Sequence, residues 1–206
     1  SFIYVTLFIY SIPQYSCIKK WFSSHNKTMK TRDYINIFII FSILGFLSEF
    51  IISLCMHAQK QTLLIGPWMP IYGLGILLVL GIDHILSKKL HGKEKIFFCF
   101  LLSFFLLTLI EGLGGFLTNF FFQKNFWDYT NLPFSIGMHM NILISLIWGA
   151  AALFICYFVL PRIKHLLSKI PIWLTLLLSI VFLIDNLYCF WKNCTLFSLI
   201  ICYFLW

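Results

Sequence analysis

Long apolar runs alternate with short polar segments along the whole chain. Spanning helices are predicted over residues 34–56, 67–86, 96–122, 138–160 and 172–191. Each run is close to or above the roughly 20 residues that a helix needs to cross a bilayer. The apolar residues 1–18 are either a short first membrane helix or a signal-peptide remnant, and the missing basic n-region and small-residue cleavage site favour the helix. Residues 194–206 are expected to begin a final span. The pattern predicts an all-α, polytopic membrane bundle with about five to seven transmembrane helices.

A basic segment separates the first apolar stretch from the others. Residues 1–33 are therefore interpreted as an N-terminal apolar segment followed by a basic cytoplasmic linker. Residues 34–206 are interpreted as a single transmembrane helical domain, because no soluble insertion or internal repeat interrupts the apolar runs.

Composition excludes a water-soluble protein of this size. Of the 206 residues, 61% are hydrophobic and only 11% are charged, and the mean hydropathy is +0.92. So little polar surface cannot cover a globular domain in water. The lipid bilayer is therefore the expected surrounding of the protein.

The net charge of +8 is explained by membrane topology rather than by nucleic-acid binding. Twelve of the fifteen Lys and Arg residues fall in segments 19–32, 88–95 and 162–169, which alternating spans place on one side. An excess of Lys and Arg marks the cytoplasmic side. These segments are predicted to be cytoplasmic loops, and residues 66–73 and 127–129 are predicted to face outward.

Motifs of known catalytic and cofactor sites are missing from the sequence. It contains no GxSxG nucleophile motif, no HExxH zinc motif and no GxxxxGK[ST] phosphate loop. The seven cysteines form no CxxC pair, and Cys189 with Cys194 is the one pair considered for a disulfide. We expect no metal and no cofactor, and whether the protein is an enzyme stays open.

The stretch from Gly66 to Gly73 interrupts the apolar pattern with two prolines and two glycines. Pro67 and Pro70 lack the backbone N–H that a helix interior requires. In a membrane, irregular backbone persists only where protein or a water-filled cavity covers it. The stretch is either the plain start of a membrane helix or a structured vestibule element.

Two acidic residues lie deep inside predicted spans. By helical rise, Glu49 lies roughly 10 Å and Glu111 roughly 16 Å below the outer end of its helix. A charged carboxylate at the bilayer centre costs about 2.5–3.5 kcal/mol, so both should face the bundle interior. Small and polar residues recur on the same helix faces, which also fits simple packing seams. Asp83 lies beside Lys88 and Lys89 at the end of its span, where either an interfacial salt bridge or ordinary solvation is expected.

The motifs in their order resemble one family of membrane proteins. They are 41-FSILGFLSE-49, 66-GPWMPIYGLG-75, Glu111, 127-WDYTNLPF-134 and Trp148-Gly149. Over about residues 35–165 the chain resembles the bacterial putative ABC-transporter type IV (CmpB-like) proteins. The resemblance implies a multi-pass protein of the bacterial cytoplasmic (inner) membrane, labelled as a permease. Where an Arg is expected in that family, this chain has His139, which would make an ion pair titratable.

As a permease component, the chain would offer an outward-facing polar pocket and would need a separate ATPase subunit. The residues predicted to bind substrate are Glu49, Pro67, Trp68, Pro70, Tyr72, Glu111, Trp127, Asp128, Tyr129, His139 and Asn141. Two alternatives remain open: an envelope enzyme acting on lipid or cell-wall precursors, and a non-catalytic accessory or immunity protein. A homo-oligomer also stays open.

Overall fold

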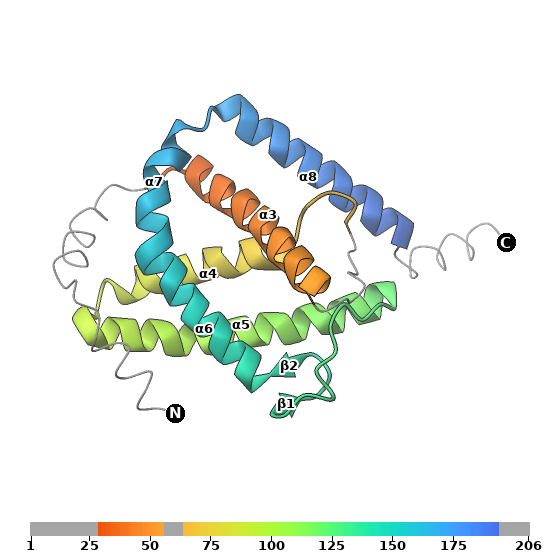
Figure 1. Ribbon diagram of the computed structural model, residues 1–206. Coiled ribbons are helices and arrows are strands. Elements are labelled where there is room, and N and C mark those ends of the chain that lie inside the picture. Colours follow the sequence, from red (N-terminus) through yellow and green to blue (C-terminus); the bar gives the residue numbers. More distant parts are fainter. Residues whose placement is uncertain (1–28, 56–63, 194–206) are drawn as a thin grey trace. The chain divides into compact units, whose positions relative to one another are not determined.

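The computed structural model describes residues 29–55 and 64–193 (Figure 1). The spans predicted over 1–18 and 194–206, most of the basic linker, and Cys194 lie outside the described residues. The elements below all belong to one compact unit, Thr31–Trp206, which is distinct from the unit Ser1–Lys30.

Helices make up most of this unit. They are α3 (Thr31–Cys55), α4 (Pro70–Leu86), α5 (Gly92–Phe122), α6 (Ile142–Phe154), the π-helical turn η1 (Ile155–Val159), α7 (Leu160–Lys169) and α8 (Ile172–Asn193). In the described part of the chain, α3, α5, α8 and the continuous helix from Ile142 to Lys169 are long and apolar enough to cross a membrane. The shorter α4 has 17 residues and a length of roughly 26 Å. The predicted all-α membrane bundle is confirmed.

A small hairpin precedes α6 and shortens the predicted 138–160 helix. Strands β1 (Ser135–Ile136) and β2 (Met140–Asn141) pair antiparallel, with Ser135 opposite Asn141. Gly137 in the connecting turn has φ +68°, which glycine adopts without steric cost. The Asn141 side chain then caps α6 by accepting from the N–H groups of Leu143 and Ile144 at 2.9 and 3.2 Å.

The predicted basic loop over 162–169 is wrong, because this segment is the helix α7. Pro161 lacks the N–H that would bond the carbonyl of Tyr157 in an α-helix. The backbone instead widens by one residue, and the Leu160 N–H donates to Ile155 O, five residues back. A π-helical turn therefore carries the chain past the proline, and the helix continues into a basic, amphipathic segment.

Glycines allow α3 and α4 to pack closely. A Cβ atom on Gly45 of α3 would overlap the ring of Tyr72, and one on Gly73 of α4 would overlap Ser42 and the carbonyl of Phe38. The small-residue face predicted for residues 42–53 thus lies against α4, as expected for close contact of membrane helices. This contact fixes the position of Tyr72 next to the turn of α3 that carries Glu49.

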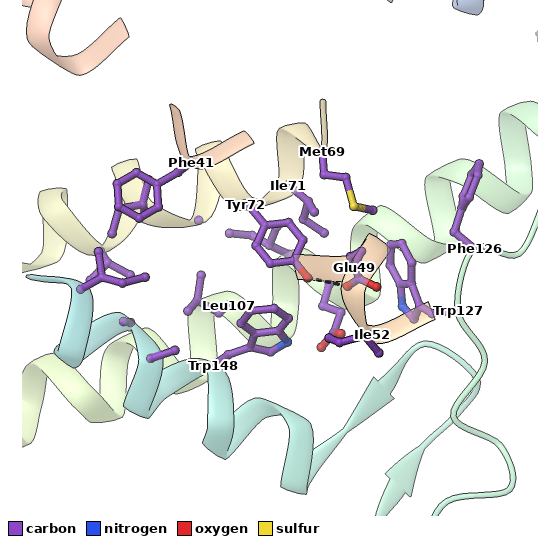
Figure 2. Close-up of a pocket in the computed structure, with 18 of the residues that line it drawn as sticks. Phe41, Glu49, Ile52, Met69, Ile71, Tyr72, Leu107, Phe126, Trp127 and Trp148 are labelled. Atoms are coloured by element: carbon purple, nitrogen blue, oxygen red, sulfur yellow. Dashed lines mark hydrogen bonds between the residues drawn. The ribbon is translucent and has the colours of Figure 1, made fainter. Parts of the chain in front are cut away.

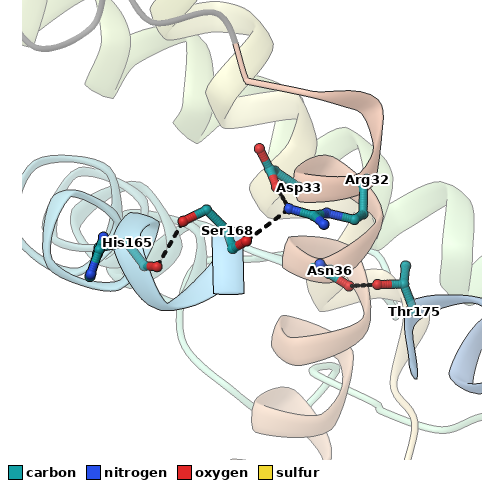
Figure 3. Close-up of polar contacts among 6 residues, drawn as sticks. All are labelled: Arg32, Asp33, Asn36, His165, Ser168 and Thr175. Atoms are coloured by element: carbon teal, nitrogen blue, oxygen red, sulfur yellow. Dashed lines mark hydrogen bonds and ion pairs between the residues drawn. The ribbon is translucent and has the colours of Figure 1, made fainter. Parts of the chain in front are cut away.

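Polar contacts join the ends of three helices that are distant in sequence (Figure 3). Arg32 at the start of α3 donates to the carbonyl of Ser168 in α7 at 2.9 Å and pairs with Asp33 at 3.6 Å. Thr175 of α8 donates to the Asn36 side chain at 2.8 Å, and both residues are buried. These bonds hold α7 and α8 against the first turns of α3.

The segment before α4 is also fixed, which answers the two alternatives for the Gly66–Gly73 stretch. Pro70 is in the first turn of α4, where its missing N–H has no cost. The Asp185 carboxylate of α8 accepts from the N–H of Gly66 at 2.9 Å, and the Met69 N–H donates to Ser42 O at 3.0 Å. The stretch is therefore both a helix start and a bonded connection between α3 and α8.

Candidate functional site

One cavity of about 300 Å³ contains both membrane carboxylates (Figure 2). Its walls come from α3, α4, α5, the α6–η1 helix and the loop after α5. Glu49 and Glu111 both line it, as do the aromatic side chains of Phe41, Tyr72, Phe126, Trp127, Tyr129 and Trp148. Along α4 it extends as far as Val79, roughly 13 Å from Pro70, and along the α6–η1 helix it extends to Ile155.

The first carboxylate is bonded to a tyrosine of the neighbouring helix. Figure 2 shows the Tyr72 hydroxyl pointing at Glu49. This hydroxyl donates a hydrogen bond to Glu49 Oε1 at 2.5 Å. The Tyr72 ring packs edge-on against Trp148 at 5.1 Å between centroids. Because Gly45 leaves room for this ring, the close packing of α3 and α4 places the phenol at the carboxylate.

The second carboxylate repeats this arrangement with a tyrosine from the loop. The Tyr129 hydroxyl donates to Glu111 Oε1 at 2.6 Å. Burial and, after it, the bond to Glu111 raise the pKa of Tyr129 above its ordinary value. The phenol is therefore a proton donor at neutral pH. Glu111 is 7% exposed, and its Oε2 has no hydrogen-bond partner, although the Trp148 indole lies beside the carboxyl.

The hairpin holds the loop that carries Trp127 and Tyr129. The Tyr129 N–H donates to Met138 O at 2.8 Å, and the Trp127 indole N–H donates to His139 O at 3.2 Å. The Ser135 hydroxyl also donates to Tyr129 O. The buried Asn141 side chain donates to Pro133 O at 2.8 Å while it caps α6. Backbone bonds therefore position both aromatic residues over the cavity.

Five of the residues predicted to bind substrate line this cavity: Glu49, Tyr72, Glu111, Trp127 and Tyr129. The other six do not line it. His139 packs over Gly115 and against the Trp127 ring, and Asn141 is the helix cap. Asp128 is exposed and accepts from both the hydroxyl and the N–H of Thr130.

The bonds from Thr130 lower the pKa of the Asp128 carboxyl. The remaining three residues lie at the start of α4 and in the connection before it. Pro67 is exposed and Pro70 starts the helix. Trp68 is 5% exposed and packs edge-on against Phe182 of α8. These residues shape the surroundings of the cavity rather than its wall.

A second polar cluster, near the Leu86 end of α4, joins three helices in a way that was not predicted from the sequence. Asp83 of α4 and Lys95 of α5 form an ion pair at 2.7 Å, with side-chain exposures of 1% and 0%. The Tyr157 hydroxyl of η1 donates to the same Asp83 oxygen at 2.9 Å. Of the two interpretations of Asp83, solvation is wrong, whereas a salt bridge is present, although it is buried and formed with Lys95. The placement of Lys95 in a loop is also wrong, because α5 begins at Gly92.

The sequence does contain a signal for this second cluster. Lys95, Cys99 and Ser103 recur every four residues, and all three are fully buried on one face of α5. Such a face predicts contact with protein rather than with lipid. The amino-acid sequence does not show that Asp83, which precedes a basic loop, faces these three residues of α5.

The composition of the two clusters bears on metal binding. Among residues 29–55 and 64–193, no three His, Cys, Asp or Glu side chains are grouped so that they could hold a metal ion. The arrangement that the structure offers is instead a pair of carboxylates inside an aromatic cavity.

Comparison with known proteins gives one match. Residues 36–190 match the family model described as "Putative ABC-transporter type IV". No curated protein and no solved structure matched the chain. The matched residues include both carboxylates, both tyrosines and the whole hairpin.

Proposed function

This chain belongs to the putative ABC-transporter type IV family, and we propose that it is the membrane-spanning permease component of such a transporter. Its cavity would bind a small solute on the outer side of the bacterial cytoplasmic membrane. A separate ATPase subunit would supply the energy from the cytoplasmic side. The observation that carries this proposal is the single cavity holding Glu49 and Glu111.

The cavity has the properties of a solute site rather than of a packing seam. Small-molecule sites are concave and mostly apolar, with few polar groups that fix the ligand. Here two carboxylates come from different helices, α3 and α5, and line one cavity. A packing seam would bury them against helix backbone and leave no volume between them.

The direction of the opening follows from the charges of the connecting segments. The loop that carries Trp127 and Tyr129 follows α5, whose other end adjoins the basic residues of segment 88–95. Because Lys and Arg mark the cytoplasmic side, the loop and the cavity mouth lie outside. A solute would then enter beside the aromatic residues of this loop.

Helix α7 supplies a docking element on the cytoplasmic side. Coupling to an ATPase requires exposed structure there, and the sequence alone predicted only a short loop. The structure has a ten-residue amphipathic helix with Arg162, Lys164 and Lys169, and Leu166 is 61% exposed. Through η1 this helix is continuous with α6, which lines the cavity, so a movement of α7 would reach the site.

The test is purification of the tagged full chain from its native host in mild detergent. We expect a second polypeptide with a GxxxxGK[ST] motif in a fixed stoichiometric ratio, together with ATP hydrolysis. Substituting Leu166→Glu should remove that polypeptide, whereas Leu132→Glu in the outer loop, at 46% exposure, should retain it. Isolation without any nucleotide-binding subunit, after crosslinking as well, would contradict the proposal.

A further inference from the structure

The part of the cavity wall that the structure describes carries no cationic side chain. Of the residues that the structure describes, those lining it include two glutamates but no Lys, Arg or His. Tyr72 and Tyr129 donate their hydroxyl groups to Glu49 and Glu111, and a phenol is a neutral donor. A phenol stabilises a carboxylate by hydrogen bonding but leaves the net negative charge in place.

One acceptor atom in the cavity is unsatisfied. Only 7% of the surface of Glu111 is exposed, and its Oε2 atom receives no hydrogen bond. Buried polar atoms are almost always bonded, so each exception requires an explanation. A ligand that donates a hydrogen bond or carries positive charge would complete this carboxylate.

The remaining lining is aromatic. Tyr72, Trp127, Tyr129 and Trp148 surround the two carboxylates, and the faces of such rings attract cations. Aromatic walls combined with carboxylates are suited to an ammonium group, whose charge is spread over apolar substituents. They disfavour an anion, which would meet two like charges in a low dielectric.

A bare metal ion fits less well than an organic cation. Calcium takes six to eight oxygen ligands, and magnesium retains several waters, as a rule. The polar lining that the structure describes is limited to a few oxygens on an otherwise apolar wall. With about 300 Å³, the cavity has room for on the order of ten water-sized groups. That volume suits an ammonium ion with several carbon atoms.

From these four properties we infer that the cavity binds an organic ammonium ion, with Glu111 Oε2 facing the cationic group. This assignment rests on the proposal that the cavity is the solute site, and it names the class of solute. Glu49 supplies the second negative charge, and Tyr72 and Tyr129 fix the carboxylates in orientation.

The experiment is isothermal titration of the purified full chain in lipid nanodiscs. The cationic probes are methylammonium, tetramethylammonium, choline and putrescine. The matched neutral probe is 3,3-dimethylbutan-1-ol, which has the shape of choline without its charge, and the anionic probe is pivalate. We expect at least one cation to bind, and we expect the neutral alcohol to bind at least tenfold more weakly than choline or not at all.

Variants then connect binding to the cavity. Glu111→Gln keeps the shape of the side chain and should weaken binding of the cation about tenfold or more. Glu94→Gln is the matched control, because Glu94 is an exposed glutamate at the far end of the same helix, and it should leave the affinity unchanged. Tyr129→Phe, which frees Glu111 Oε1 without removing charge, should have a smaller effect than Glu111→Gln.

The outcomes separate this inference from the proposed function. If no cation binds, if the neutral alcohol binds as well as choline, or if Glu111→Gln binds with unchanged affinity, the ammonium assignment is overturned. The comparison of choline with its neutral isostere uses the unaltered protein, so it holds even if a variant misfolds. An ATPase subunit that copurifies despite such a result would still support transport. Cation binding without any ATPase subunit would support the assignment and contradict the transport role.

Discussion

The two polar clusters of this protein use the same kinds of side chain in opposite ways. Near the Leu86 end of α4, Asp83 is paired with Lys95 and bonded by Tyr157, so the charges of this pair are neutralised within the protein. In the outer cavity, Glu49 and Glu111 are each bonded by a tyrosine, and the described lining provides no cation. Both clusters include a residue of α4, Tyr72 in one and Asp83 in the other.

This difference indicates which cluster is structural and which is open to a ligand. A buried ion pair with good geometry is complete, so disturbing it mainly affects stability. A carboxylate with space beside it and one oxygen without a hydrogen bond keeps an unsatisfied acceptor until a ligand binds. The predictions below test this contrast, beginning with the largest expected effect.

Removing the lysine from the cluster of Asp83, Lys95 and Tyr157 should have the largest effect on stability. Lys95→Met leaves Asp83 buried without its partner, which costs about 3–5 kcal/mol of unfolding free energy in comparable cases. The control Lys93→Met changes an exposed lysine in the same turn and should cost about 1 kcal/mol or less. Thermal unfolding in detergent measures both. If both variants lose a similar amount of unfolding free energy, the Asp83–Lys95 pair does not stabilise the bundle.

Filling the contact between α3 and α4 should disturb the outer cavity. In Gly45→Ala the new methyl group overlaps the Tyr72 ring, and overpacking of this kind costs about 1–3 kcal/mol. Tyr72 would move away from Glu49, so affinity for a cationic probe should change as well. Gly81→Ala is the matched control, because no atom lies within 4 Å of a Cβ at that position of α4. If Gly45→Ala is as stable as Gly81→Ala, the described helix contact is wrong.

Glu49 and Glu111 should be energetically coupled because they share one cavity. Each substitution by Gln removes like-charge repulsion, so the second should stabilise less than the first. A double-mutant cycle on thermal stability should give a coupling of about 0.5–1 kcal/mol. The control cycle pairs Glu111→Gln with Glu94→Gln and should be additive within about 0.5 kcal/mol. Additivity in both cycles would place the two carboxylates in separate environments.

The smallest effect is expected in the outer loop, at Asp128. Bonds from Thr130 lower its pKa, so the folded state favours the carboxylate. Its contribution to stability is therefore present above the ordinary Asp pKa of about 3.9 and is lost as pH falls through the lower folded value. Asp128→Asn should be slightly less stable than the unaltered protein at pH 7, and the difference should vanish in acid. A difference that persists at low pH would exclude this origin.

Local sequence signals sufficed for much of the site. The depth of Glu49 and Glu111 in apolar runs predicted that both face the bundle interior, and the structure places them in one cavity. The aromatic loop after α5 was also identified, and Trp127 and Tyr129 reach that cavity. His139 and Asn141 have the same polar character, yet they hold the hairpin and cap α6. Residue type alone does not distinguish a wall residue from a supporting one.

By itself, the sequence determined that this is a multi-pass helical membrane protein and where most of its long apolar helices lie, although it did not reveal helix α7. Apolar runs of spanning length and scarce charge leave few other structures, because every backbone polar group must be bonded inside a bilayer. The tertiary structure decided which polar residues meet. Lys95 forms an ion pair with Asp83, and Tyr129 donates a hydrogen bond to Glu111. Both interactions depend on contacts between helices and a hairpin that no local pattern specifies. Which polar side chains contact one another depends on the rotation of each helix and on close packing at glycines, and therefore on the bundle as a whole.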